Sequence, residues 1–198
     1  CVSIMNVRHF FPEYSVEKKI VDEITQWTAE VLEKPSPFFN DLPACPYAKQ
    51  ALIDEKVAIL FKYEPHYQTL YSTISQFEDG FDLAIIIDLN NQKNSDDFHN
   101  YLDDLNTAIS EGMFIDKDIW VMGFHPDDEP SDFEEEVDFE PVTEVEYSMI
   151  FVQRLSKLQV AADKLNKRGY YNSYGSDYNV SDTYNRRENL YRRLTNGN

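Results

Sequence analysis

Two residues of the sequence combine a reactive side chain with a position at the end of a predicted element. Cys45 directly precedes Pro46, which can occupy the first turn of a helix, so its thiol is expected beside unpaired helical N–H groups. Those partial positive charges favour the thiolate, which is the nucleophilic form. His125 follows an apolar run that predicts a strand, and an imidazole can serve as the base for a thiol. The sequence therefore indicates Cys45 and His125 as a catalytic pair.

Two cations could hold a substrate beside that pair. Lys49 lies one helical turn after Cys45, and Arg154 lies in a later apolar segment. Ammonium and guanidinium groups pair with carboxylates and phosphates, so both residues are ligand-binding candidates for a small anionic ligand. Structural roles stay open beside these: a buried thiol at Cys45, a hydrogen-bonded histidine at His125 and a solvated Lys49.

Residues 125–129 read HPDDE, which resembles the metal motif of zinc-dependent N-acetyl-sugar deacetylases. The resemblance implies that His125 and Asp128 bind zinc, and that Asp127 acts as the base toward a zinc-bound water. That family takes a further histidine from a later segment, and no histidine follows position 125 in this chain. We therefore expect no metal and no cofactor, and keep a zinc hydrolase as an alternative.

The composition limits the partners of the protein. Its 198 residues carry a net charge of −18, which repels phosphate backbones and anionic lipids, so neither nucleic acid nor a membrane is expected as a partner. A hydrophobic content of 42% is enough for a packed core. The apolar runs are too short to cross a bilayer and no signal-peptide pattern is present, so we predict a cytoplasmic protein.

Helical and strand patterns alternate along the chain. The predicted helices cover 16–33 (with Ser15 as N-cap and Pro35 as the stop), a segment from Pro46 onward, a segment near 66–78, and 96–111 with Ser95 as N-cap. The predicted strands cover 57–62, 82–89 and 118–124, and residues 147–165 show the spacing of one amphipathic helix.

This alternation indicates an α/β fold in which helices pack on a small, partly parallel sheet of three or four strands. Segment 82–89 is apolar on both faces, so it is expected as the inner strand, flanked by 57–62 and 118–124. A ferredoxin-like α+β arrangement with antiparallel strands is the alternative.

Charge and composition divide the chain into a single domain at 1–166 and a tail at 167–198. The domain includes a loop at 127–146 with eleven acids and no Lys or Arg, whereas the Tyr- and Asn-rich tail is net positive. The tail is expected to fold back on the acidic body, to join subunits of a homo-oligomer, or to be disordered. A short final helix is predicted from Tyr184, Leu190, Tyr191 and Leu194.

These two segments support an alternative function, a non-catalytic binding or assembly protein that uses the acidic loop and the tail as partner surfaces. Binding of a divalent cation by the carboxylates of the loop is a further alternative, although their spacing does not match a calcium-binding loop.

Three short motifs occur in the chain in a recognisable order. Residues 45–49 read CPYAK, residues 124–126 read FHP and residues 147–154 read YSMIFVQR. Over about residues 16–165 the chain resembles an uncharacterised bacterial family, a domain of unknown function with CPFAK, FHP and PYPMLHLLR motifs. The resemblance implies a compact α/β protein with Cys45, Lys49, His125 and Arg154 near one another, and it implies no reaction. Phe151 stands where the family pattern has a histidine, which puts any chemistry that uses that histidine in doubt.

Overall fold

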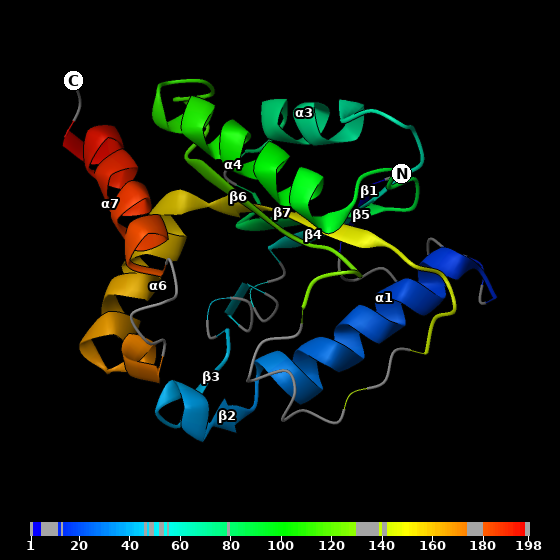
Figure 1. Cartoon of the computed structure of the whole chain (residues 1–198), viewed down its shortest axis with the longest axis horizontal. Helices are drawn as coiled ribbons and strands as arrows, with labels where there is room; N and C mark the ends of the chain where they lie inside the picture. The colour runs from blue at the N-terminus through cyan, green and yellow to red at the C-terminus, as the bar shows by residue number, and fades with distance from the viewer. Residues whose placement is uncertain are drawn as a thin grey trace.

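A computed structural model describes residues 2–4, 12, 14–45, 47, 50–51, 54, 56–78, 80–129, 139, 142–173 and 180–196 of the protein. Within these residues the chain forms a mixed β-sheet with helices on both faces (Figure 1). The predicted α/β class with a partly parallel sheet is confirmed. No helix in the described part of the chain is long and apolar enough to cross a bilayer.

The sheet has five strands in the order β1-β4-β5-β7-β6. Their bounds are β1 (Val2–Ile4), β4 (Val57–Lys62), β5 (Leu83–Asp88), β6 (Ile119–Phe124) and β7 (Ser148–Arg154). Strands β4 and β5 are parallel, while β7 is antiparallel to both β5 and β6, so β4, β5 and β6 run in one direction. The prediction of segment 82–89 as an inner strand beside 57–62 is confirmed.

The prediction for residues 147–165 is wrong in its first half. Ser148–Arg154 is strand β7, and the helix α6 covers only Leu155–Lys167. Almost every residue of β7 is buried, because a central strand packs helices against both faces. Such a strand reads as a short apolar run, which helical spacing can imitate. As a consequence β6 does not flank β5, since β7 is inserted between them in the manner of a split βαβ unit.

Helices α3 (Gln68–Ser75) and α4 (Ser95–Ser110) cover one face of the sheet. The two helices pack on alternate residues of the strands, and helices and strands together form one apolar cluster. The strand residues of this cluster include Ala58, Ala84, Ile86, Ile150 and Val152. The N-cap of α4 is Asn94 instead of the predicted Ser95, because the Asn94 side chain accepts a hydrogen bond from the Asp97 amide at 2.8 Å.

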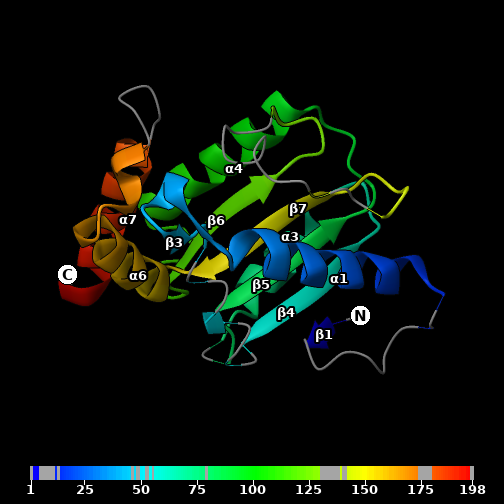
Figure 2. The same ribbon diagram turned by 90° about the horizontal axis from the view of Figure 1, so that it is seen from below.

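Helix α1 (Val16–Trp27) crosses the opposite face and continues as the π-helical turn η1 (Thr28–Leu32) (Figure 2). The predicted cap is confirmed, because the Ser15 hydroxyl accepts from the Lys18 amide at 3.2 Å. Ile20 and Ile24 pack on the strand residues that point to this side. Of the helix predicted from Pro46 onward, residues 47, 50 and 51 are helical, and Pro46 and Lys49 lie outside the described residues.

The remaining elements gather at one end of the sheet. They are β2 (Pro35–Ser36), η2 (Pro37–Phe39), β3 (Leu42–Pro43), η3 (Tyr170–Ser173) and α7 (Val180–Asn196). The predicted final helix is confirmed as α7, which packs on α6 and buries Leu190 in the main core. Arg186 of α7 pairs with Asp103 of α4 at 2.5 Å, so this part of the tail folds back on the acidic body.

Candidate functional site

The sheet register separates His125 from Arg154. Phe124, the last residue of β6, pairs with Met149, whereas Arg154 pairs with Ile119 at the start of β6. With a rise of about 3.3 Å per residue, His125 and Arg154 stand about 20 Å apart along the strands. The expectation that these two residues lie near one another is therefore wrong.

His125 is enclosed and fully hydrogen-bonded, with 2% of its surface exposed. Its Nδ1 accepts from the Asp127 amide at 3.1 Å. Nε2 lies 3.0 Å from the Lys93 carbonyl and beside the Asn91 side-chain amide. The ring thus joins the end of β6 to the loop before α4, which supports the structural role for His125 that the sequence left open.

Asp128 closes the turn that follows His125. Its carboxylate accepts hydrogen bonds from the His125 amide at 2.7 Å, the Ser95 hydroxyl at 2.5 Å and the His99 ring at 2.8 Å. Burial raises the pKa of Asp128, but these three donors outweigh burial and hold the pKa below its usual value. Asp127, by contrast, has a side chain that is 72% exposed.

The groups of the HPDDE segment that resembled metal ligands thus make hydrogen bonds within the protein. Both His125 ring nitrogens and both Asp128 oxygens have hydrogen-bond partners. Within the described ranges no group of three or more His, Cys, Asp and Glu side chains is arranged to hold a metal ion. The acidic loop lies mostly outside the described residues, at 130–138 and 140–141. Its far end is tied to α1, where buried Glu23 accepts from Thr143 and from the Tyr147 hydroxyl.

Arg154 is also committed to the fold. Its guanidinium donates to the carbonyls of Phe81 and Glu78, lies 3.5 Å from the Asp82 carboxylate and stacks 4.9 Å from the centre of the Phe77 ring. These contacts fasten the end of β7 to the segment that leads into β5. They support a structural role for Arg154, in addition to the ligand-binding role that the sequence indicated.

Cys45 is half-buried and lies toward the Arg154 end of the sheet. Its amide donates to the Leu32 carbonyl at 3.1 Å, at the end of η1. Two residues later the Tyr47 hydroxyl donates to the carbonyl of Asp82, at the start of β5. Cys45 is therefore held near the start of β5, whereas His125 stands beyond the end of β6. The structure does not bring the predicted catalytic pair together.

Two residues from the tail, Tyr171 and Arg187, interact with each other, and the charge of Cys45 also acts on Tyr171. Burial raises the pKa of the Tyr171 hydroxyl, a hydrogen bond and the charge of Arg187 lower it, and a thiolate at Cys45 raises it. The Tyr171 hydroxyl thus has a hydrogen bond with Arg187, and its pKa responds to the charge of Cys45. Burial raises the pKa of the Tyr47 hydroxyl, and the charges of Asp82 and, to a smaller extent, Cys45 raise it as well.

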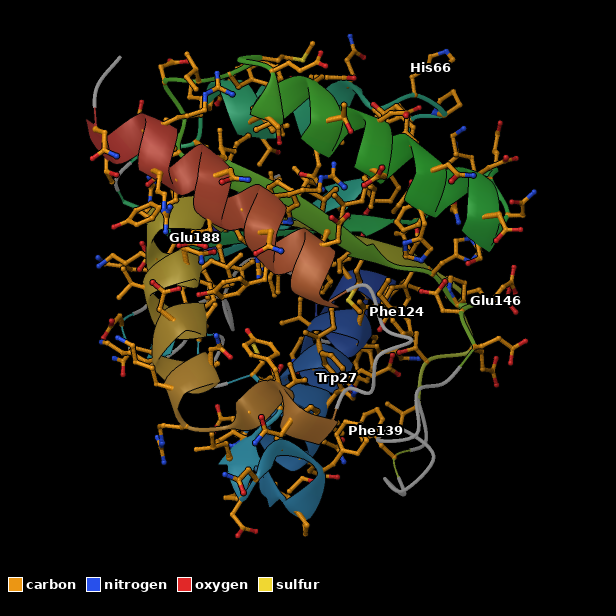
Figure 3. The ribbon with its side chains drawn as sticks, turned by 60° about the vertical axis from the view of Figure 1, so that its left-hand side comes forward. Trp27, His66, Phe124, Phe139, Glu146 and Glu188 are labelled. Atoms are coloured by element: carbon orange, nitrogen blue, oxygen red, sulfur yellow. The ribbon has the colours of Figure 1, made fainter. Side chains whose placement is uncertain are left out.

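An apolar cluster supports this group of side chains from the side of α1. Trp27 and Phe139 pack in the same cluster as Tyr171 and Ala44, the residue before Cys45. Figure 3 shows Trp27 and Phe139 below the first turns of α7, on the flank where the C-terminal elements meet α1. The cluster therefore joins Tyr171 of the tail to the segment that contains Cys45.

Four buried side-chain atoms in the described part of the chain have no hydrogen-bond partner. They are Oγ of Ser148, Oε1 of Gln153, Oε1 of Gln159 and Nε of Arg187, the residue that interacts with Tyr171. Buried donors and acceptors are nearly always paired in folded proteins, so such atoms point to water, an ion or a ligand. The guanidinium would accept an anion, because it donates to carboxylates and phosphates.

Sequence patterns did not indicate that Tyr171 packs with the segment of Cys45 or that Arg187 interacts with Tyr171. Both residues lie in the tail, whose tyrosine and arginine content is visible in the sequence. Tyr171 is separated from Cys45 by more than a hundred residues, so no spacing pattern connects them and only tertiary packing joins the two segments.

Comparison with protein-family models, with curated proteins and with solved structures finds no match for this chain. The resemblance to the bacterial family of unknown function stays a prediction.

Proposed function

We propose that the protein carries a thiol site for a small anionic molecule, in which Cys45 supplies the nucleophile and Arg187 binds the anionic group. The observation that carries the proposal is the buried Nε of Arg187, which has no acceptor, although the same side chain interacts with Tyr171, a residue of the cluster that contains Ala44 next to Cys45. Of the catalytic pair that the sequence indicated, the proposed site retains Cys45, and residues of the tail take the place of His125.

The electrostatics of the three side chains support this chemistry. A buried guanidinium N–H without an acceptor costs about 1–3 kcal/mol, which an anionic ligand would recover. In the proposed site the same positive charge serves to stabilise a thiolate, which is the nucleophilic form of a cysteine. Burial raises the pKa of Tyr171, so at neutral pH the phenol keeps its proton and its hydroxyl can donate to the thiolate or to the ligand.

Two alkylating reagents of different charge test the proposal. In a Cys1→Ser background, the labelling rates of Cys45 by anionic iodoacetate and by neutral iodoacetamide are measured from pH 6 to pH 9. Because Arg187 would bind the iodoacetate carboxylate, Arg187→Gln is expected to lower the iodoacetate-to-iodoacetamide rate ratio at least about threefold, the scale of a partly exposed ion pair.

Arg186→Gln is the matched control, since it removes the same charge from the adjacent residue, whose guanidinium pairs with Asp103. If the iodoacetate-to-iodoacetamide rate ratio falls equally in both variants, the effect comes from the net charge of the protein and contradicts the proposal. Labelling of Cys45 only after denaturation would remove the nucleophile and contradict it as well.

A further inference from the structure

A cavity lies between α3 and the strands β4 and β5. It has a volume of about 400 Å³, near the lower end of ligand pockets, which span about 300–1,000 Å³. Its floor is apolar and is formed by Ala58 and Leu60 of β4 and Ala84 of β5. Ala58 and Ala84 are direct neighbours in the register, so two small side chains side by side leave the space open.

Helix α3 turns a polar flank over this floor. The lining residues Gln68, Thr69, Ser72, Thr73 and Gln76 recur at helical spacing, and the opposite flank buries Leu70 and Ile74 in the core. Hydroxyl and amide groups therefore line the rim above an apolar floor. A ligand that suits such a cavity has an apolar body and a polar end.

The two ends of the cavity differ in chemistry. At one end lies Glu64, whose Oε1 accepts from the Thr69 amide at 2.8 Å, and at the other end lie the rings of Phe77 and Phe81. Burial raises the pKa of Glu64. Hydrogen bonds from Thr69 and the positive charge of Lys62 lower this pKa by more than burial raises it, so the carboxylate is charged at neutral pH. Thr69 fixes this carboxylate at the rim before any ligand arrives.

The charge near this rim is negative. The Lys62 ammonium is buried and lies 2.9 Å from the Asp88 carboxylate, so that pair is neutral and Glu64 leaves one negative charge. At the far end the Arg154 guanidinium already lies over the Phe77 ring, so a second cation is disfavoured there and an apolar group is favoured. This arrangement orients a ligand with its cation at Glu64 and its apolar body toward Phe77.

The geometry points to a binding site for a small organic amine in this cavity, with Glu64 as the counter-ion and the Ala58–Ala84 floor as the apolar seat. This site is independent of the Cys45 site and has the opposite charge preference. An anionic ligand of the same shape is rejected because its charge would face Glu64.

Isothermal titration calorimetry on the full chain tests the site with three probes of one shape: phenethylamine, the neutral 2-phenylethanol and the anionic phenylacetate. We expect phenethylamine to bind most tightly and phenylacetate not to bind. Glu64→Gln should weaken phenethylamine at least about fivefold, the scale of a partly exposed ion pair, and leave 2-phenylethanol unchanged. Glu78→Gln, a carboxylate outside the cavity lining, should leave both affinities unchanged.

Two further variants fill the cavity. Ala84→Leu places a larger side chain on the floor, and Ser72→Trp covers the rim from an exposed position that the core does not need. Both should abolish binding of phenethylamine and of 2-phenylethanol, and the second serves if the first fails to fold. The inference is overturned if phenethylamine does not bind, if phenylacetate binds equally well, or if Glu64→Gln or Ser72→Trp leaves the amine affinity intact.

Discussion

At the scale of single residues, Asp128 shows how one carboxylate can hold a turn. Three donors converge on it from the end of β6 and from α4, namely the His125 amide, the Ser95 hydroxyl and the His99 ring. The same acid that resembled a zinc ligand in the sequence therefore ties β6 to α4 across the edge of the sheet.

Asp128 should make the stability of the protein depend on pH in the acidic range. Its folded pKa lies below the usual 3.8, so its contribution is complete above that value and is lost as the pH falls through the folded pKa. We expect Asp128→Asn to lower the free energy of unfolding by about 2 kcal/mol at pH 7, because charge-assisted hydrogen bonds are lost, and by much less at pH 2.5. Urea unfolding at both pH values measures this, with exposed Asp127→Asn as control. An equal loss at the two pH values would contradict the assignment.

At the scale of elements, the packing of α4 on β6 depends on Gly123. A Cβ built at this position would lie 2.5 Å from Leu102 Cδ1 and 2.5 Å from Phe98 Cε1, both in α4. The absence of a side chain therefore lets the helix approach the strand closely, immediately before the turn that contains His125.

Gly123→Ala should force α4 away from β6. We expect a loss of about 2 kcal/mol in the free energy of unfolding, the range of overpacked cores. Gly80→Ala is the matched control, because nothing lies within 4 Å of a Cβ at that position. Chemical denaturation of the two variants measures the difference. Equal free energies of unfolding would show that α4 moves to accommodate the methyl group without loss of stability, which would contradict the prediction.

At the scale of the whole molecule, the tail is part of the fold where the structure describes it. Leu190 is 3% exposed in the main core, and Arg186 contacts Asp103 and the Trp120 ring. These residues are used within the chain, so they are not available as partner surfaces. Assembly of a homo-oligomer through other residues of the tail stays a prediction.

Apolar burial, more than charge, should hold the tail in place. Leu190→Ala is expected to cost about 3 kcal/mol in the free energy of unfolding, because it leaves a cavity in the core. Arg186→Gln is expected to cost less than about 1 kcal/mol, since the side chain of its partner Asp103 is 61% exposed and solvent screens the pair. Urea unfolding at low and high salt compares the two variants. A larger loss for Arg186→Gln would mean that electrostatic attraction between tail and body dominates.

The sequence by itself determined the local features of the protein. Ser15 caps α1, the apolar segment 82–89 is an inner strand, and the parallel direction of β4 and β5 follows from the helix between them. Each of these depends on residues close together in the chain, where helical or strand periodicity and capping chemistry act. The α/β class followed from the order of these elements.

Only the tertiary structure decided the rest. Ser148–Arg154 fits both periodicities, and it is a strand because the space between β5 and β6 buries both of its faces. Tyr171 of the tail packs in the same cluster as Ala44, the residue before Cys45, whereas His125 lies beyond the far end of β6, since the folding back of the tail and the register of the sheet fix those positions. Such contacts join residues far apart in the chain. No local sequence pattern predicts them, because the free energy that stabilises them comes from burial in the assembled core.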